Sequence, residues 1–372
     1  MSKLGRIGID ARKLRDGGIG RYVRELLGAL VRCDEAPELV ALAPARERAA
    51  IAAIDPGIAV VEVDAPGYSL RELVAVAVAA RRARLDLLHL PHYPLPFRVP
   101  CPVVVTVHDL IHLRVPRSQG RSVYARWMLG RVRRRAAVVL SPSQATARDL
   151  VDRLGFASER VRVVPQGVPR SFVQPPPPAG DVERFRATRG LVEPYLLHVT
   201  NGLPHKGLDL LLRAWRDLEK VQLAIAGQGS GRDAVRARIA TEPASIRARV
   251  VVLGELAERD LVLAYRGARA VVAPSLLEGF GFPALEAMAA GTPVVASDAG
   301  GLPEVIGDAG MLFPAGCVDK LKDAIYMLFF AIDCAQREGL IRRGFERARR
   351  FSWESAARAT LQAYEAALGA AA

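Results

Sequence analysis

Short apolar runs alternate with longer amphipathic stretches along the whole chain. The strand-like runs are 6–10, 39–42, 59–63, 87–90, 103–107 and 137–140 in the first half, and 195–199, 221–226, 250–253, 270–273 and 294–297 in the second. Continuous apolar strands separated by helices are typical of parallel sheets that helices cover on both faces. The pattern therefore predicts an α/β fold with two doubly wound, Rossmann-like parallel-sheet domains facing a central cleft.

A proline-rich stretch separates the two halves. The run Gln174-Pro175-Pro176-Pro177-Pro178-Ala179-Gly180 can continue neither a helix nor a central strand. A chain of 372 residues is also long enough for two domains, each with its own core. We therefore place a first domain at 1–173, a linker at 174–182, a second domain at 183–350 and a closing helix at 351–372, with Ser352 as its N-cap.

Composition narrows the class of protein. The chain is 51% hydrophobic, yet no apolar stretch reaches the length of a membrane span and nothing resembles a signal peptide. The four cysteines, at positions 33, 101, 317 and 334, show neither paired spacing nor the spacing of metal ligands. We therefore expect reduced thiols and a cytoplasmic location.

Two glutamates, Glu278 and Glu286, bracket a glycine-containing loop and the start of a helix. The loop follows the apolar run 270–273, and Pro283 suits the first helical turn. A helix N-terminus offers unpaired N–H groups to an anion, while ionised carboxylates accept hydrogen bonds from hydroxyls. A diphosphate that carries polyhydroxylated groups, such as a nucleotide-sugar, fits both features.

This segment resembles the E-x7-E motif of retaining glycosyltransferases with the two-domain GT-B fold, in particular the large family 4. The resemblance extends over nearly the whole chain. It implies that Glu286 binds the ribose of the donor, that Glu278 lies beside the transferred sugar and the diphosphate, and that Gly279, Phe280 and Gly281 line the same site. It also implies that the first domain binds the acceptor, that the second binds the donor, and that the last helix crosses back to the first domain.

A lysine follows the run 195–199, in the segment Thr200-Asn201-Gly202-Leu203-Pro204-His205-Lys206-Gly207. At a helix start beside a glycine, Lys206 is placed to neutralise a diphosphate as a point charge, although a solvated surface lysine is an equal alternative from spacing alone. The resemblance implies that Lys206 contacts the diphosphate. Many family members carry an arginine where this chain has Asn201, so we expect Lys206 to bear more of the charge, with help from helix N-termini.

Histidines stand at two predicted strand ends. His108 and Asp109 follow the run 103–107, where a histidine points into the cleft and is more often a structural hydrogen-bonding group than a catalytic one. The resemblance implies that His108 faces the transferred sugar near the reacting carbon, with Asp109 orienting it or touching the acceptor. His89 and His92 have no carboxylate or cysteine at ligand spacing, so we assign no metal, and no cofactor apart from the donor substrate.

Three glycines, Gly17, Gly18 and Gly20, precede a helix that we expect at 23–31. The segment is not G-x-G-x-x-G, because position 23 is valine, and this disfavours a nicotinamide site. A plain strand-to-helix turn would need a single glycine. The segment looks like the family's mobile glycine loop, which lets the acceptor and the diphosphate approach the backbone closely.

Positive charge is concentrated in the first half of the chain. The net charge is +13, and residues 1–180 contain 28 bases against 16 acids. No carboxylate interrupts the nine arginines between positions 109 and 149. On a helix, one face would hold Val123, Tyr124, Trp127 and Met128 and continue as arginines 131, 134 and 135.

Two interpretations of this basic segment remain open. It is either a core-packing helix with a solvated basic end or a peripheral contact with anionic membrane lipid through Arg114 to Arg135. Specific nucleic-acid binding is disfavoured because no recognised nucleic-acid motif accompanies the charge.

The resemblance thus implies a retaining, metal-independent hexosyltransferase of polysaccharide biosynthesis, with a glycan or a lipid-linked sugar as the acceptor. The Asn201…Pro204-His205-Lys206 variant and the Thr106-Val107-His108-Asp109 form look closest to mannosyltransferase-like members, so GDP-mannose is the first choice of donor and a UDP-hexose the second. We expect it in the cytoplasm or at the inner face of the membrane. The rivals are a nucleotide-sugar epimerase of the same fold and a non-catalytic basic nucleic-acid or scaffold protein.

Overall fold

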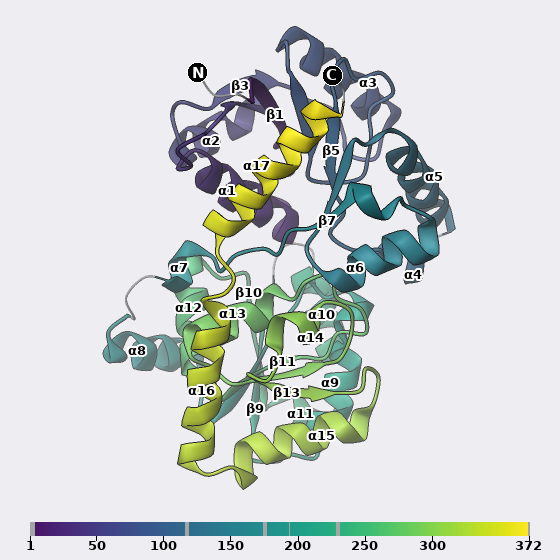
Figure 1. Ribbon diagram of the computed structural model, residues 1–372. Helices are drawn as coiled ribbons and strands as arrows, with labels where there is room; N and C mark the ends of the chain where they lie inside the picture. The colour runs from purple at the N-terminus through teal and green to yellow at the C-terminus, as the bar shows by residue number, and fades with distance from the viewer. Residues whose placement is uncertain (1–3, 116–118, 174–176, 193, 228–230, 371–372) are drawn as a thin grey trace. The chain divides into compact units, whose positions relative to one another are not determined.

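The chain folds into two compact units, each built around one parallel sheet. The computed structural model describes residues 4–115, 119–173, 177–192, 194–227 and 231–370. One unit comprises Met1–Gly167 together with Ser352–Ala372, and the other comprises Val168–Phe351 (Figure 1). The two Rossmann-like sheets that the alternating pattern predicts are present.

The boundary between the units falls after Gly167, whereas the sequence placed it after residue 173. Val168 and Phe172 belong to the core of the second unit, where the Phe172 ring lies 5.4 Å from that of Tyr265. Residues 174–176 of the predicted linker lie outside the described residues. Helix α8 (Ala179–Arg189) already includes positions 179–182, because the proline run ends at residue 178 and the helix begins directly after it.

The sheet of the first unit has seven parallel strands in the order β3-β2-β1-β4-β5-β6-β7. The central strands β4, β5 and β6 are buried at every position and are mostly apolar, and each contains one polar residue, His89, Thr106 and Ser141 respectively. The strands are β1 (Arg6–Asp10), β2 (Glu38–Ala43), β3 (Ala59–Glu62), β4 (Leu87–Leu90), β5 (Val103–Thr106), β6 (Val138–Ser141) and β7 (Val161–Val163).

Helices cover both faces of this sheet. α3 (Leu70–Arg82) and α5 (Gln119–Arg135) share one core with the strands. On the other face, α17 (Trp353–Gly369) packs against α1 (Gly17–Leu30) and strands β4 to β6 (Figure 1). As expected, Ser352 caps α17, and its side chain accepts a hydrogen bond from the Ser355 N–H at 3.1 Å. The shorter helices are α2 (Arg48–Ile54), α4 (Ile111–Arg114) and α6 (Gln144–Arg148).

The sheet of the second unit has six parallel strands in the order β10-β9-β8-β11-β12-β13. Neighbouring residues of one strand enter different cores, as Leu196 and Leu197 of β8 do, so both faces are covered. The strands are β8 (Tyr195–Val199), β9 (Gln222–Ala226), β10 (Val250–Gly254), β11 (Ala270–Ala273), β12 (Val294–Ser297) and β13 (Met311–Phe313).

The helices of the second unit form two layers. The core on one face includes residues of α12 (Glu258–Gly267), α13 (Phe282–Ala290) and α14 (Leu302–Ile306), and the core on the other includes α9 (Leu208–Trp215), α10 (Gly231–Ala240) and α15 (Val318–Tyr326). The remaining helices are α7 (Arg170–Val173), α11 (Ala244–Arg247) and α16 (Cys334–Ala348). No helix in the described part of the chain is both long and apolar enough to cross a bilayer.

Each sheet has one place where the strand order reverses. It lies between β1 and β4 in the first unit and between β8 and β11 in the second. Open α/β sheets bind ligands outside the carboxyl ends of the strands at this point. The segments that leave these four strands are therefore the first places to look for a site.

Candidate functional site

The glycine loop after β11 holds Glu278 at the switch point of the second unit. Pro283 lies in the first turn of α13, as expected for a residue without an N–H. The backbone carbonyl of Glu278 accepts a hydrogen bond from the Gly301 N–H at 2.9 Å, which ties this loop to the start of α14. The fold therefore fixes the backbone of Glu278 and leaves its side chain to neighbouring groups.

Lys206 and Glu278 form an ion pair across the switch point. Lys206 follows β8 and Glu278 follows β11, and Lys206 Nζ lies 2.7 Å from Glu278 Oε2. The two side chains are 16% and 13% exposed. The Ser275 hydroxyl, a contact that sequence reasoning missed, donates to the same carboxylate oxygen at 3.1 Å. The structure thus brings two of the three predicted catalytic residues together, a cation beside a carboxylate.

The position of Lys206 depends on the glycine that follows it. Lys206 ends a 3-10 turn (Pro204–Lys206), and Gly207 has a φ of 74° directly before α9. A Cβ on Gly207 would lie 2.0 Å from the carbonyl oxygen of Pro274, at the end of β11. The close approach of the two segments therefore requires glycine here, and it is what brings Lys206 within reach of Glu278.

Glu286 lies deeper than Glu278, in the second turn of α13. It is 1% exposed, and its Oε2 accepts a hydrogen bond from the Tyr265 hydroxyl at 2.7 Å. Tyr265 is fully buried on α12 and was not singled out from the sequence. The predicted ribose-binding carboxylate is therefore held by a tyrosine from a neighbouring helix.

The other predicted donor-site residues differ in what they expose. The Phe280 side chain is buried, and its ring lies 5.6 Å from Phe282 and 5.8 Å from Phe351, so only its backbone and those of Gly279 and Gly281 are placed to line a site. Asn201 is exposed, and its Oδ1 accepts a hydrogen bond from the Leu203 N–H at 3.3 Å. Asn201 therefore orders its own loop and adds no charge to that of Lys206.

His108 in the first unit has both ring nitrogens occupied. Its Nε2 donates to the Pro91 carbonyl at 3.0 Å, so Nδ1 is the acceptor, and it receives a hydrogen bond from Gln166 Nε2 at 3.0 Å. Burial lowers the pKa of His108 to about 4. The ring is therefore neutral at pH 7, and its position is fixed by Gln166, a buried residue that the sequence pattern did not reveal.

A buried polar network lies behind His108. His89 Nδ1 and the Tyr364 hydroxyl of α17 are 2.7 Å apart, and His89 Nε2 is 2.8 Å from the Thr106 hydroxyl. Thr106 is in turn 3.0 Å from the hydroxyl of Tyr22, whose ring packs edge-on against His108 with centroids 4.7 Å apart. His89 is thus a structural residue of the core, and the closing helix helps to support the histidine site.

The predicted glycine loop is part of a helix, which corrects the sequence interpretation. Helix α1 begins at Gly17 and includes Gly18 and Gly20 in its first turns, although we expected a loop up to Tyr22. A Cβ on Gly20 would lie 2.3 Å from the Leu14 carbonyl oxygen. Gly20 therefore allows the segment after β1 to lie directly against α1, and this packing extends the helix toward its N-terminus.

The basic helix α5 does not present the single face that the sequence predicted. Met128 is fully buried and Tyr124 half-buried, whereas Val123 is 68% and Trp127 42% exposed. The split arises because Ala125, Leu129 and Val132 carry the helix into the core together with Met128.

Two arginines of this helix stabilise the fold. Arg131 donates to the carbonyl oxygens of Leu95 and Pro96, at 3.3 and 3.0 Å, and Arg135 donates to that of Phe97 at 2.8 Å. Arg126 and Arg134 are exposed. Arg117, which belongs to the same predicted segment, lies outside the described residues.

Comparisons with known proteins identify the family of the chain. Residues 181–329 match the family model "Glycosyl transferases group 1", and residues 16–172 match "Glycosyltransferase Family 4". A D-inositol 3-phosphate glycosyltransferase from Xylanimonas cellulosilytica is 32% identical over 389 aligned positions, which cover 94% of this chain and 91% of that protein. The O-antigen chain mannosyltransferase B of Escherichia coli is 28% identical over 78% of this chain and 76% of its own length.

Solved structures show the same fold. Sucrose-phosphate synthase from Thermosynechococcus elongatus has a TM-score of 0.77 at 22% identity, covering 99% of this chain and all of that one. HepE from Anabaena, in complex with UDP-glucose, has a TM-score of 0.75 at 21% identity, covering 97% and 98% of the two chains.

Proposed function

The chain belongs to glycosyltransferase family 4 and is a glycosyltransferase, and from this premise we propose that it is a retaining, metal-independent hexosyltransferase. The donor in this proposal is a nucleotide-sugar, and the acceptor is a glycan or a lipid-linked sugar. The observation that carries the proposal is the pairing of Lys206 with Glu278 at a switch point. One cation suits a diphosphate, and one carboxylate suits the hydroxyls of a sugar.

In the proposed reaction, the bond between the anomeric carbon and the diphosphate oxygen breaks while the acceptor hydroxyl attacks from the same face. The hydroxyl proton passes to the departing diphosphate oxygen, so no protein nucleophile is needed. Lys206 and the backbone N–H groups before α13 stabilise the charge that develops on the diphosphate. Lys206 must exchange its Glu278 partner for the diphosphate, and this exchange frees the carboxylate to bind the sugar.

The roles of the remaining predicted residues follow from their surroundings. Glu286 binds the ribose from its place beside Tyr265. His108 is assigned to positioning the sugar and does not act as a base, since its Nδ1 lone pair is taken by Gln166 and its pKa is held at about 4 by burial. Gly17 and Gly18 at the start of α1 let substrate approach the backbone.

GDP-mannose is our first choice of donor, and a UDP-hexose is the second. The mannosyltransferase among the similar proteins supports the first, and the neighbour with UDP-glucose bound supports the second. A thermal-shift panel of GDP, UDP and ADP separates them, because a ligand that binds only the folded protein raises its melting temperature. A panel in which none of the three raises the melting temperature would contradict the nucleotide-sugar proposal.

Product analysis tests the reaction itself. We expect proton NMR of the product to show the anomeric configuration of the donor, and an inverted product would refute the retaining mechanism. The rival epimerase predicts turnover of the donor without any acceptor. Donor that stays unchanged until acceptor is added, and is then consumed with release of nucleoside diphosphate, favours the transferase.

For location, we propose a cytoplasmic protein that contacts the inner face of the membrane through α5, consistent with a role in polysaccharide biosynthesis. The exposed residues Trp127, Arg126 and Arg134 support this contact, since each basic side chain near an anionic surface contributes about 1 kcal/mol. Co-sedimentation with anionic vesicles should fall for Arg126→Glu with Arg134→Glu. The matched control is Arg81→Glu with Arg82→Glu, at the exposed end of α3. Equal binding of all three proteins would leave α5 as a packing helix.

A further inference from the structure

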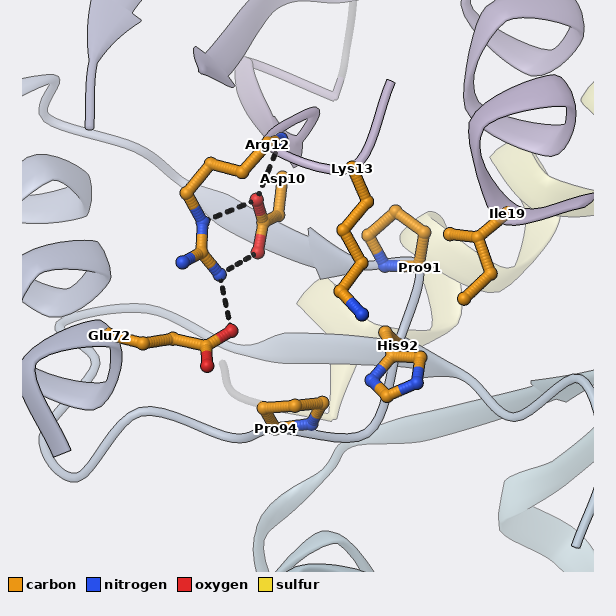
Figure 2. A pocket seen from close by; sticks show the side chains of 8 residues that line it. All are labelled: Asp10, Arg12, Lys13, Ile19, Glu72, Pro91, His92 and Pro94. Carbon is orange, nitrogen blue, oxygen red and sulfur yellow. Dashed lines mark hydrogen bonds and ion pairs between the residues drawn. The ribbon is translucent and has the colours of Figure 1, made fainter. Parts of the chain in front are cut away.

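A pocket opens at the switch point of the first unit, between the carboxyl ends of β1 and β4 (Figure 2). Its polar walls come from the segment after β1, the start of α3 and the segment after β4, and Ile19 of α1 closes one side. The polar lining residues are Asp10, Arg12, Lys13, Glu72 and His92. Among them, only His92 stands out in the sequence, and no metal is assigned to it.

The carboxylates of the pocket are already satisfied within the protein. Arg12 Nε donates to one oxygen of Asp10 at 2.9 Å, and its Nη2 donates to the other oxygen and to Glu72 Oε1, both at 2.7 Å (Figure 2). The second oxygen of Glu72 accepts a hydrogen bond from the backbone N–H of Tyr68. Arg12 and the two acids therefore stabilise one another and leave no acceptor that calls for a ligand.

Lys13 is in a different position, because its partners are weak. Its side chain is 17% exposed, and its ammonium lies 3.3 Å from the Tyr68 hydroxyl and 4.4 Å from the centre of that ring. The carboxylate with which it pairs, that of Asp16, is 3.9 Å away and 61% exposed. A half-buried ammonium with three hydrogens, one neutral hydroxyl partner and one distant, exposed carboxylate is under-satisfied.

The tautomer of His92 follows from the same contacts. Lysine can only donate, so the Tyr68 oxygen accepts from Lys13 and directs its own proton to His92 Nε2, at 3.1 Å. The imidazole proton of His92 is therefore on Nδ1. This nitrogen is buried and has no hydrogen-bond partner among the residues that the structure describes. Burial, together with the nearby charge of Lys13, lowers the pKa of His92 well below its ordinary value, so the ring remains a neutral donor.

Backbone strain supports a functional arrangement. Tyr68 has a φ of 61°, a left-handed conformation that is costly for a bulky residue and that persists where surrounding contacts impose it. Its N–H is bonded to Glu72 and its hydroxyl to His92. The strained residue is thus the one that sets both Lys13 and His92 in place.

We propose that this pocket binds an oxyanion of the acceptor, a phosphate monoester or a carboxylate, which receives hydrogen bonds from the Lys13 ammonium and from His92 Nδ1. The inference rests on the proposed function, in which the first unit binds the acceptor. Asp10 and Glu72 are bound to Arg12, so an oxyanion supplies the close negative charge and the acceptor atoms that Lys13 and His92 lack, whereas a neutral hydroxyl supplies no charge. The pocket adjoins the histidine site, since its Pro91 carries the carbonyl that His108 binds.

The first test measures binding directly, with inorganic phosphate, acetate and glucose as probes at constant ionic strength. We expect phosphate or acetate to shift the ring resonances of His92 in protein with nitrogen-15-labelled histidine, and glucose to leave them unchanged. A response to phosphate alone identifies a phosphate ester, and a response to acetate alone identifies a carboxylate. A response to glucose alone, or to none of the three, would overturn the proposal.

Variants assign the effect to the named groups. Lys13→Met keeps the aliphatic stem and removes the charge, and it should weaken anion binding about tenfold or more, because hydrogen bonds to charged groups are among the stronger ones. Lys320→Met, at an exposed lysine of α15, is the matched control and should bind as the parent protein does. His92→Phe, which keeps an aromatic ring but has no Nδ1 proton, should reduce anion binding measured by calorimetry.

The outcomes separate this inference from the proposed transferase function. Nucleoside diphosphate binding at Lys206 should be the same in Lys13→Met and in the parent protein, which also shows that the variant is folded. Unchanged anion binding in Lys13→Met would refute the pocket proposal and leave the donor site intact. If the parent protein binds the anions normally but shows no transferase activity with any acceptor, that result would count against the proposed function alone.

Discussion

Replacing Glu278 by glutamine should tighten the binding of a free nucleoside diphosphate, although the proposed mechanism needs this residue for turnover. In the structure Lys206 Nζ lies 2.7 Å from Glu278 Oε2. A diphosphate must therefore compete with this carboxylate for the lysine ammonium. Glu278→Gln keeps the shape of the side chain and removes the competing charge.

The size of the effect follows from the geometry of the pair. Two unit charges about 4 Å apart interact by roughly 4 kcal/mol at an effective dielectric constant of about 20. Both side chains retain some exposure, at 16% and 13%, so we take about half of this value. About 2 kcal/mol corresponds to roughly a 30-fold increase in diphosphate affinity. Lys206→Met should change the affinity by a similar factor in the opposite direction.

Isothermal titration calorimetry with GDP and UDP measures both changes, and a free diphosphate avoids any contribution from the sugar. Turnover with the nucleotide-sugar should fall in both variants. The exposed Glu255 supplies a matched control, since Glu255→Gln removes the same charge elsewhere in the second unit. The reasoning is refuted if Glu278→Gln weakens diphosphate binding as Lys206→Met does, because the carboxylate would then support the site and not compete for it.

Further predictions concern other parts of the two sites. Glu286→Ala should weaken nucleotide binding by tenfold or more, since it removes the carboxylate assigned to the ribose; unchanged affinity would end that assignment. Transfer should survive EDTA, because the described ranges hold no group of three His, Cys, Asp or Glu side chains placed for a metal ion, and loss of activity that magnesium or manganese restores would contradict it. Burial lowers the pKa of His108 to about 4 and of His89 to about 3, so the unfolded chain, with values near 6.5, binds more protons. Apparent stability in urea should therefore be full at pH 7 and fall as the pH drops from about 6.5 toward 4, and less steeply in His89→Gln. Gly207→Ala should destabilise the folded protein far more than Gly190→Ala, which costs about 1 kcal/mol. Both glycines have positive φ, but only at Gly207 would the added Cβ lie 2.0 Å from a carbonyl oxygen. Equal melting temperatures of the two variants would disprove the clash.

The strands were predictable because their physical cause is local in the sequence. A strand buried on both faces is largely apolar, so β5 is visible from its three consecutive valines and β11 as an unbroken run of alanine and valine. The edge strands β7 and β13 were missed, because each has three residues and is only partly buried. The predicted start of α1 was wrong for a related reason. The close contact between Gly20 and Leu14 favours glycine in the first turns of the helix, and such a contact leaves no periodic pattern in the sequence.

The sequence by itself determined the fold class and offered two carboxylates and one lysine as donor-site candidates, and the resemblance to the family, not spacing alone, assigned their roles. Only the tertiary structure decided which side chains meet. Lys206 and Glu278 lie 72 positions apart and become partners because β8 and β11 are neighbours in the sheet. The tertiary structure also decides three other contacts. They are those of Gln166 with His108, of Tyr265 with Glu286, and of Lys13 and His92 within the pocket of the first unit. A hydrogen bond between distant segments depends on strand order and helix packing, and these are set by the burial of the whole core and not by any short stretch of the chain.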